Sequence, residues 1–148
     1  MIEVTCALII DNQNRLLAAQ RSSNMSLPLK WELPGGKVEQ NETLEECIIR
    51  EIDEELNIKI NIVEQIESNI HYYPTITIKL IPFICKHVRG QVVLKEHANF
   101  KWVNNNDLLD LDWAEADIPI IKNYLNHPNV TLNNLSRRGL IHARDRYR

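Results

Sequence analysis

The chain has 148 residues, of which 44% are hydrophobic and 25% charged, and these values are ordinary for one soluble globular domain with its own core. The first ten residues lack the basic stretch and cleavage site of a signal peptide, and no apolar run is long enough to span a membrane, so a membrane partner is excluded. The formal net charge of −3 is spread unevenly, and the acidic part of the chain argues against a nucleic-acid polymer as the main partner.

Strand-like and turn-like segments alternate at the start of the chain. Residues 2–10 are apolar and β-rich, a turn follows at 11–14, and residues 15–20 return as a second strand, so these segments predict a hairpin. Residues 22–30 form a polar loop, and a Gly-Gly turn at 35–36 then leads into a helix.

This helix is predicted over residues 44–56. Thr43 and Glu46 fit a capping box, in which the threonine hydroxyl accepts from the third helical N–H and the glutamate reaches back to the threonine backbone. At about 100° per residue the apolar residues gather in one stripe. The stripe consists of Leu44, Ile48 and Ile52, with Cys47 and Leu56 at its margins.

Three glutamates, Glu51, Glu54 and Glu55, lie on the inward side of this helix or beside it. Two of them occupy the last turn, at the negative end of the helix dipole, where each carboxylate is disfavoured by about 0.3–1 kcal/mol. Carboxylates three and four residues apart also repel each other, and Arg50 supplies only one positive charge. Because Mg²⁺ takes oxygen ligands and shares them with substrate phosphates, the pattern predicts one or more Mg²⁺ ions, with Mn²⁺ as a substitute, rather than a solvated acidic face.

Further strands and a second helix follow. Two long β-like runs, at 58–70 and 75–88, meet at a turn around Tyr73-Pro74. Strands with two interspersed helices predict an α+β or α/β/α layered domain over residues 1–126. The remaining elements are a strand at 100–103, a capped turn or short helix at 104–109, and a final helix at 118–126 with Asp117 as its N-cap.

The last residues of the chain are basic, and its three cysteines lie far apart in the sequence. Residues 127–148 hold five arginines and one aspartate, a net charge of +4 that leaves −7 on the rest of the chain. Three roles are open to this tail: docking on the acidic body, binding a polyanion, or moving freely. Its Asn-rich start favours a mobile or loosely docked tail. The three cysteines are odd in number and set among aliphatic residues, so we expect buried thiols in a reducing compartment, the cytoplasm.

Residues 36–58 resemble the motif of the Nudix hydrolases, G-x5-E-x7-R-E-U-x-E-E-x-G-U, in which U is a bulky aliphatic residue. One position differs, because Asn57 stands where the family has glycine. Asparagine is the next choice after glycine for the left-handed residue that ends a helix, so we expect the turn to be kept. The matching positions are Gly36, Glu42, Arg50, Glu51, Ile52, Glu54, Glu55 and Ile58.

The resemblance covers about residues 2–126 and is strongest to the MutT-like branch. It implies the Nudix fold, an α/β/α layered domain with a mixed β-sheet between helices. It also implies that Arg50 orients the glutamates and that the general base is Glu54 or Glu96. The residues alone favour an ordinary surface-loop acid at Glu96 as much as a metal ligand or general base. The implied metal ligands are the Gly36 carbonyl, Glu51, Glu54, Glu55 and Glu96.

Substrate contacts outside the motif are implied in the same way. Arg21 and Lys37 match phosphate-contacting positions, although Arg21 is also typical of an exposed strand end. Asp117 matches the base-reading position, where a carboxylate, which only accepts hydrogen bonds, suits the exocyclic amine of cytosine or the N–H groups of a purine. His97 is interpreted as a loop residue rather than a ligand.

The implied reaction is Mg²⁺-dependent hydrolysis of a nucleoside triphosphate to a monophosphate and pyrophosphate, by a monomer or homodimer. The segments around Trp102 and Asp117 look most like the CTP pyrophosphohydrolase group, which favours CTP, dCTP or a modified pyrimidine nucleotide as the small-molecule substrate. The alternatives are an 8-oxo-dGTP diphosphatase, another Nudix substrate such as a dinucleotide or nucleotide sugar, and a non-catalytic nucleotide-binding module. The last is disfavoured because no acid of the motif is missing.

Overall fold

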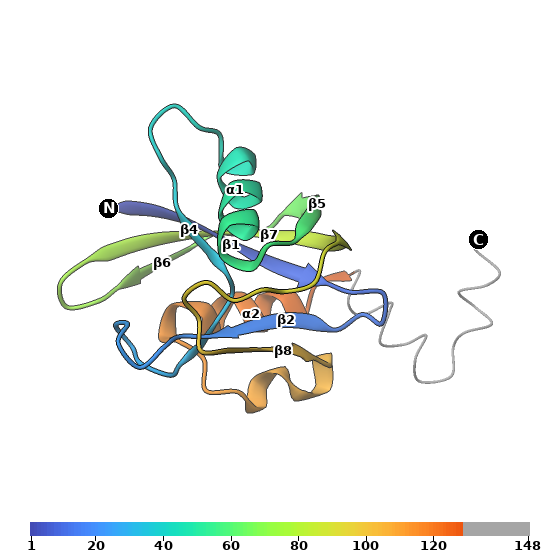
Figure 1. The fold of residues 1–148 in the computed structure, drawn as a ribbon. Helices are drawn as coiled ribbons and strands as arrows, with labels where there is room; N and C mark the ends of the chain where they lie inside the picture. Colours follow the sequence, from blue (N-terminus) through green and yellow to red (C-terminus); the bar gives the residue numbers. More distant parts are fainter. Residues whose placement is uncertain (129–148) are drawn as a thin grey trace.

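The computed structural model describes residues 1–128, in which a mixed β-sheet lies between helix α1, Leu44–Leu56, and helix α2, Ile118–Leu125 (Figure 1). This arrangement confirms the predicted layered fold. Of the basic tail predicted at 127–148, all but the first two residues lie outside the described residues. Within the described part of the chain, neither helix has the length and apolar character needed to cross a membrane.

Within residues 1–128 the sheet has eight strands, which run in both directions. Strand β1 pairs in parallel with β7 over nine residues, from Ile2 opposite Ile78 to Ile10 opposite Lys86, and the other strand pairs are antiparallel. The central order is β3-β2-β1-β7-β5, with β4 beside β1, β6 beside β7 and β8 beside β2. The strands are β1 Ile2–Ile10, β2 Leu16–Gln20, β3 Trp31–Glu32, β4 Gly35–Lys37, β5 Lys59–Gln65, β6 Asn69–Tyr72, β7 Thr77–Arg89 and β8 Asn99–Val103.

Each face of the sheet carries its own hydrophobic core, because side chains alternate between the two faces of a strand. On β1, Ala7 and Ile9 face α1, where they pack in one cluster with Ile48 and Ile52. Cys6 and Leu8, which alternate with them, belong to the opposite cluster, which includes Ile120, Ile121 and Tyr124 of α2. The central strand is therefore buried on both sides.

Both ends of α1 have the predicted caps. The Thr43 hydroxyl accepts from the Glu46 N–H at 3.1 Å, and the Glu46 carboxylate accepts from the Thr43 N–H at 2.8 Å. At the other end Asn57 has φ 58° and ψ 34°, and its N–H donates to the Asp53 carbonyl. The exchange of glycine for asparagine in the motif therefore keeps the left-handed turn.

Residues 58–70, which were predicted as one β-like run, divide into β5 and β6, both of which pair with β7. The Ile66 N–H donates to the Pro82 carbonyl at 3.0 Å, but proline has no N–H to give in return. The ladder on that side of β7 is interrupted there, and pairing resumes with Asn69 opposite Leu80. Strands β3 and β4 were also not predicted, because they are only two and three residues long.

The cap predicted for the second helix is wrong in one respect. Asp117 precedes α2, but its side chain makes no capping hydrogen bond. It belongs to a short 3₁₀ turn, Glu115–Asp117, and its carboxylate points across the fold to accept from the Leu33 N–H at 3.0 Å. The segment predicted at 104–109 is likewise a 3₁₀ helix, Asn105–Asp110, without a side-chain cap.

Candidate active site

The first part of the site is a close contact between β4 and α1. A Cβ atom built on Gly36 would lie 2.3 Å from the Glu51 carboxyl carbon and 2.5 Å from each of its oxygens. Only glycine therefore lets the backbone lie this close to the carboxylate. The carbonyl of Gly36 accepts from the Thr5 hydroxyl at 3.3 Å and from the Cys47 thiol at 3.6 Å.

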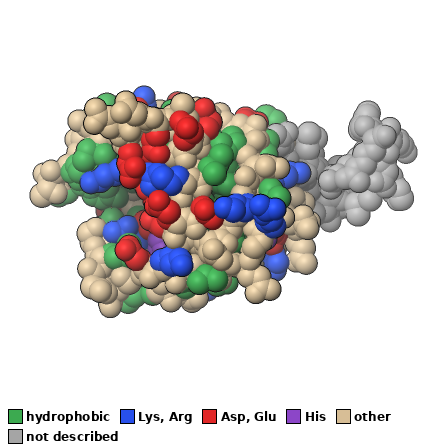
Figure 2. Space-filling model, turned by 45° about the horizontal axis from the view of Figure 1, so that its top comes forward, with side chains coloured by type: hydrophobic (Ala, Val, Ile, Leu, Met, Phe, Trp, Pro, Cys, Tyr) green, Lys and Arg blue, Asp and Glu red, His purple; other side chains and the backbone are tan. Residues whose placement is uncertain are grey.

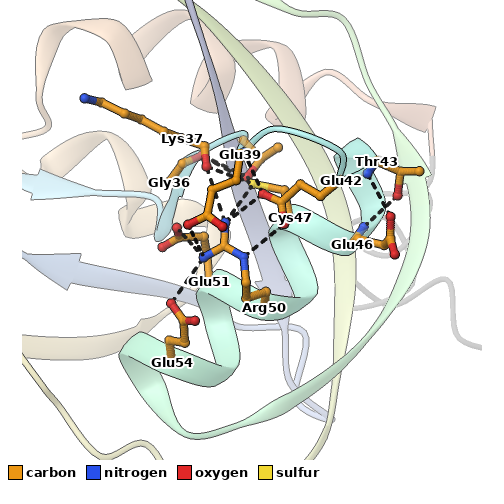
Figure 3. A network of polar contacts seen from close by, with 11 residues as sticks. Gly36, Lys37, Glu39, Glu42, Thr43, Glu46, Cys47, Arg50, Glu51 and Glu54 are labelled. Carbon is orange, nitrogen blue, oxygen red and sulfur yellow. Dashed lines mark hydrogen bonds and ion pairs between the residues drawn. The ribbon is translucent and has the colours of Figure 1, made fainter.

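Arg50 gathers the carboxylates around it (Figure 3). Its Nη2 lies 2.7 Å and its Nε 3.0 Å from the two oxygens of Glu42. Its Nη1 lies 3.0 Å from an oxygen of Glu51 and 3.2 Å from an oxygen of Glu54. Hydrogen bonding to Arg50 lowers the pKa of Glu42 to about 2. These contacts are the geometry that an orienting role for Arg50 requires. Figure 2 shows acidic and basic side chains side by side on the surface of the molecule.

Glu55 lies deeper than Glu54. Burial raises the pKa of Glu55 to about 7, and the nearby Glu51 and Glu32 carboxylates add to the rise, while the positive charge of His97 opposes it. A carboxyl group with this pKa carries a proton part of the time at neutral pH, unless a cation beside it compensates the charge.

The donor set fits a hard divalent cation. The groups that meet between β4 and α1 are carboxylate oxygens and the carbonyl of Gly36, without sulfur or imidazole nitrogen among the predicted ligands, and Mg²⁺ prefers such oxygen ligands. Among residues 1–128, no three acidic, histidine or cysteine side chains are already arranged around one ion position, and Arg50 contacts the oxygens of Glu51 and Glu54 instead.

Glu96 lies on the loop that follows β7. The Lys95 N–H donates to the Glu55 carbonyl at 3.3 Å, which places this loop at the end of α1. The Glu96 side chain is exposed, and within residues 1–128 no hydrogen bond or ion pair joins it to the glutamates of α1. The Lys37 side chain is also exposed and points away from Arg50 (Figure 3).

The second part of the site is a pocket of about 420 Å³ on the other side of β4. Gly35 lines this pocket, and its neighbour Gly36 lies against the Glu51 carboxylate. The pocket and the carboxylates are therefore one residue apart along β4. The pocket is mainly apolar, with Arg21, Glu32 and Asp117 as its charged lining residues. Its apolar walls come from Val4, Leu27, Leu33, Tyr73, Pro74, Ile76, Ile78, Leu80, Ala114 and Ala116.

Asp117 is 5% exposed in this pocket. Burial raises its pKa to about 8, the negative charge of Glu32 contributes in the same direction, and the bond from the Leu33 N–H opposes the rise. The carboxyl group is therefore mostly protonated at neutral pH. From the sequence we expected the Asp117 carboxylate only to accept hydrogen bonds. The protonated carboxyl group instead donates one hydrogen bond and accepts others.

Two residues of the site, Glu32 and His97, were not predicted. One oxygen of Glu32 lies 2.7 Å from Arg21 Nη1, and the other lies 2.7 Å from His97 Nε2. Arg21, for which a phosphate contact was expected, is thus paired with Glu32 in the pocket wall. The one sequence signal was that Glu32 stands between Trp31 and Leu33, so that strand alternation turns it away from these apolar neighbours.

Comparison with known proteins agrees with this geometry. The profile of the NUDIX domain matches residues 2–124, close to the extent expected from the motif. CTP pyrophosphohydrolase of Escherichia coli is 31% identical over 125 residues, which cover 84% of this chain and 92% of the relative. The 8-oxo-dGTP diphosphatase of Proteus vulgaris is 30% identical over 95 residues, which cover 64% of this chain and 85% of that enzyme.

Solved structures give the same result. A MutT protein of the Nudix hydrolase family from methicillin-resistant Staphylococcus aureus is 40% identical, with a TM-score of 0.67 and coverage of 82% of this chain and 93% of that one. The MutT protein from Methanosarcina mazei is 27% identical, with a TM-score of 0.77 and coverage of 83% and 91%. By its motif, its fold and these similarities, the chain belongs to the Nudix family.

Proposed function

We propose that the protein hydrolyses a nucleoside triphosphate to a nucleoside monophosphate and pyrophosphate, with Mg²⁺ as its metal ion and CTP, dCTP or a modified pyrimidine nucleotide as its substrate. The observation that carries the proposal is the position of the pocket, one residue along β4 from the contact between Gly36 and Glu51. A base in the pocket would leave its phosphate chain beside the glutamates of α1.

The roles of the residues follow from this placement. When bound, divalent cations neutralise phosphate oxygens and activate water. Glu51, Glu54, Glu55 and the Gly36 carbonyl would hold them, with Glu96 joining from the loop that contacts the end of α1. Glu54 and Glu96 are both exposed to water, so either could accept the proton of the attacking water molecule.

Arg50 would keep the glutamates in place between turnovers. It contacts Glu51 and Glu54 while Glu42 accepts two hydrogen bonds from the same guanidinium. A guanidinium with several carboxylate partners is held rigidly, because its planar fork fixes the direction of each bond. Arg50 would therefore limit the mutual repulsion of the acids when the cation leaves with the product.

Cytosine suits the pocket through Asp117. The protonated carboxyl group has one donor and one acceptor, and the Watson–Crick edge of cytosine offers an acceptor at N3 beside the donating N4 amine. Uracil has the opposite pattern at these two positions, so it would require the proton to lie on the other carboxyl oxygen. The similarity to a CTP pyrophosphohydrolase supports this choice. The several similar 8-oxo-dGTP diphosphatases support a purine nucleotide as the second candidate.

The decisive test compares nucleotides. We expect CTP and dCTP to give higher kcat/KM with Mg²⁺ than UTP and 8-oxo-dGTP, and pyrophosphate rather than phosphate as the product. The matched control is Glu51→Gln, which removes one charge from the cluster while keeping its size. A higher kcat/KM for 8-oxo-dGTP would establish the second candidate, and no pyrophosphate from any of these nucleotides with Mg²⁺ or Mn²⁺ would refute the proposed activity.

A further inference from the structure

His97 is a buried residue between exposed neighbours on the loop that joins β7 to β8. Its side chain is only 2% exposed, although both neighbours, Glu96 and Ala98, are exposed. The backbone is anchored on each side of it: the Lys95 N–H donates to the Glu55 carbonyl, and the Ala98 N–H donates to the Gln20 carbonyl at 2.9 Å. The imidazole ring is therefore held in a fixed position between α1 and β2.

Among residues 1–128 the ring makes one hydrogen bond, to Glu32 in the wall of the pocket. His97 Nε2 lies 2.7 Å from an oxygen of Glu32, whereas Nδ1 is buried without a hydrogen-bond partner among the described residues. An unpaired buried polar atom costs about 1–3 kcal/mol. The ring is buried despite this cost at Nδ1, and its polar contact is the bond from Nε2 to Glu32.

Glu32 is held from two sides. Arg21 binds its other oxygen at 2.7 Å and is itself fixed by bonds to the carbonyl and hydroxyl of Ser26, at 2.6 and 2.9 Å. Each carboxylate oxygen can accept two hydrogen bonds, so one acceptor position on each remains for a ligand. Glu32 lines the pocket, and His97 does not. Without His97, the carboxylate would keep only the bond to Arg21 and could rotate.

We propose that His97 is a positioning residue for substrate binding, which fixes the Glu32 carboxylate so that it presents an acceptor to an N–H group of the bound base. The inference rests on the proposed function, because it takes the pocket to be the base site. The competing role for His97 is electrostatic, since its charge also acts on Glu55. The two roles differ in outcome: loss of a bond at the pocket raises KM, whereas disturbance of Glu55 lowers kcat.

Two amide substitutions separate the roles. Glutamine places its amide nitrogen near the position of Nε2, whereas asparagine reaches only as far as Nδ1. We expect His97→Asn to raise KM for CTP about tenfold, the effect of losing one hydrogen bond to a charged group, while kcat falls far less. We expect His97→Gln to restore most of the lost affinity. His87→Asn, at a half-buried histidine on β7 whose Nε2 lies 2.7 Å from the Gly90 carbonyl oxygen, is the matched control for exchange of a histidine for an amide.

A double substitution tests whether His97 acts through Glu32. We expect Glu32→Gln and the combination of Glu32→Gln with His97→Asn to have the same KM within about twofold, because the second change removes a bond that the first has already weakened. Independent, multiplying effects would overturn the proposal. So would a His97→Asn variant with reduced kcat and an unchanged KM, or Asn and Gln variants that are indistinguishable from each other.

Failure of the proposed function has a different signature. A wild-type protein that hydrolyses no nucleotide refutes the function, and the positioning role can then be read without turnover. Side-chain ¹⁵N NMR of His97 should show an Nε2–H signal protected from exchange that shifts in Glu32→Gln and remains in His87→Asn. A signal unaffected by Glu32→Gln would show that His97 does not hold Glu32.

Discussion

Gly36→Ala should abolish most of the activity while leaving the protein folded. The added Cβ would lie 2.3 Å from the Glu51 carboxyl carbon, about 1 Å closer than the 3.4 Å at which ordinary van der Waals contact begins. The atoms in its way are the end of a flexible side chain, so the carboxylate can move aside by about that distance without disturbing the backbone. The substitution therefore displaces a predicted metal ligand and little else.

The size of the effect follows from that displacement. A shift of about 1 Å in a reacting or ligating group costs on the order of 10²-fold in rate, equivalent to about 2.7 kcal/mol of transition-state stabilisation. We expect kcat/KM for CTP with saturating Mg²⁺ to fall about 10²-fold and Tm to change by less than about 3 °C. Pyrophosphate release and thermal denaturation measure the two quantities.

Gly35→Ala is the matched control, because its added Cβ meets backbone instead of a side chain. The nearest atoms are the Thr5 carbonyl oxygen at 2.0 Å and the Cys6 Cα at 2.8 Å, both on the central strand β1. Overpacking against atoms that cannot move should destabilise the fold by about 3 kcal/mol. Equal losses of Tm in the two variants, or a fully active Gly36→Ala protein, would refute the reasoning.

Three further predictions concern Asp117, Asn57 and the general base. The pKa of Asp117 is raised from 3.8 to about 8. The stability that its neutral form contributes is therefore fully present below about pH 4 and is lost as the pH rises through about 8. Thermal denaturation should therefore show Asp117→Asn to be more stable than the wild type at pH 8, with the gap closing towards pH 4. Asn57→Gly relieves a left-handed residue with φ 58°, so we expect a gain of about 0.5–1 kcal/mol in unfolding free energy and an unchanged kcat, and a loss of stability would contradict this. Of Glu54→Gln and Glu96→Gln, the general base is the residue whose substitution lowers kcat by about 10²–10⁴-fold, and near-normal turnover in either variant removes that residue from the role.

Local features of the fold could be predicted from the sequence because their causes are local. The capping box at Thr43, the left-handed Asn57 and the hairpin strands depend on residues a few positions apart. The break between β5 and β6 could not be predicted, because its cause is Pro82 on another strand. The Asp117 side chain is bonded to Leu33 rather than to its own helix for the same reason.

The site divides in a similar way. The glutamates of α1 were recognisable because one helix carries them at fixed spacing, and their contacts with Arg50 lie within the motif. Glu32 and His97 are 65 positions apart and meet only in the folded structure. The exposure of Glu96 shows a further limit, since a short loop match indicates a place in the chain without giving the direction of a side chain.

The parallel ladder between β1 and β7 also sets an order for folding during synthesis. β1 is synthesised before α1, β5 and β6, yet β7, with which it forms a nine-residue ladder, becomes available only after all of them have been made. Non-local pairing of this kind is slow, because the chain between the strands must be ordered before their contacts form. A nascent chain that ends before β7 leaves its central apolar strand with an open edge, where it is prone to pair with other chains.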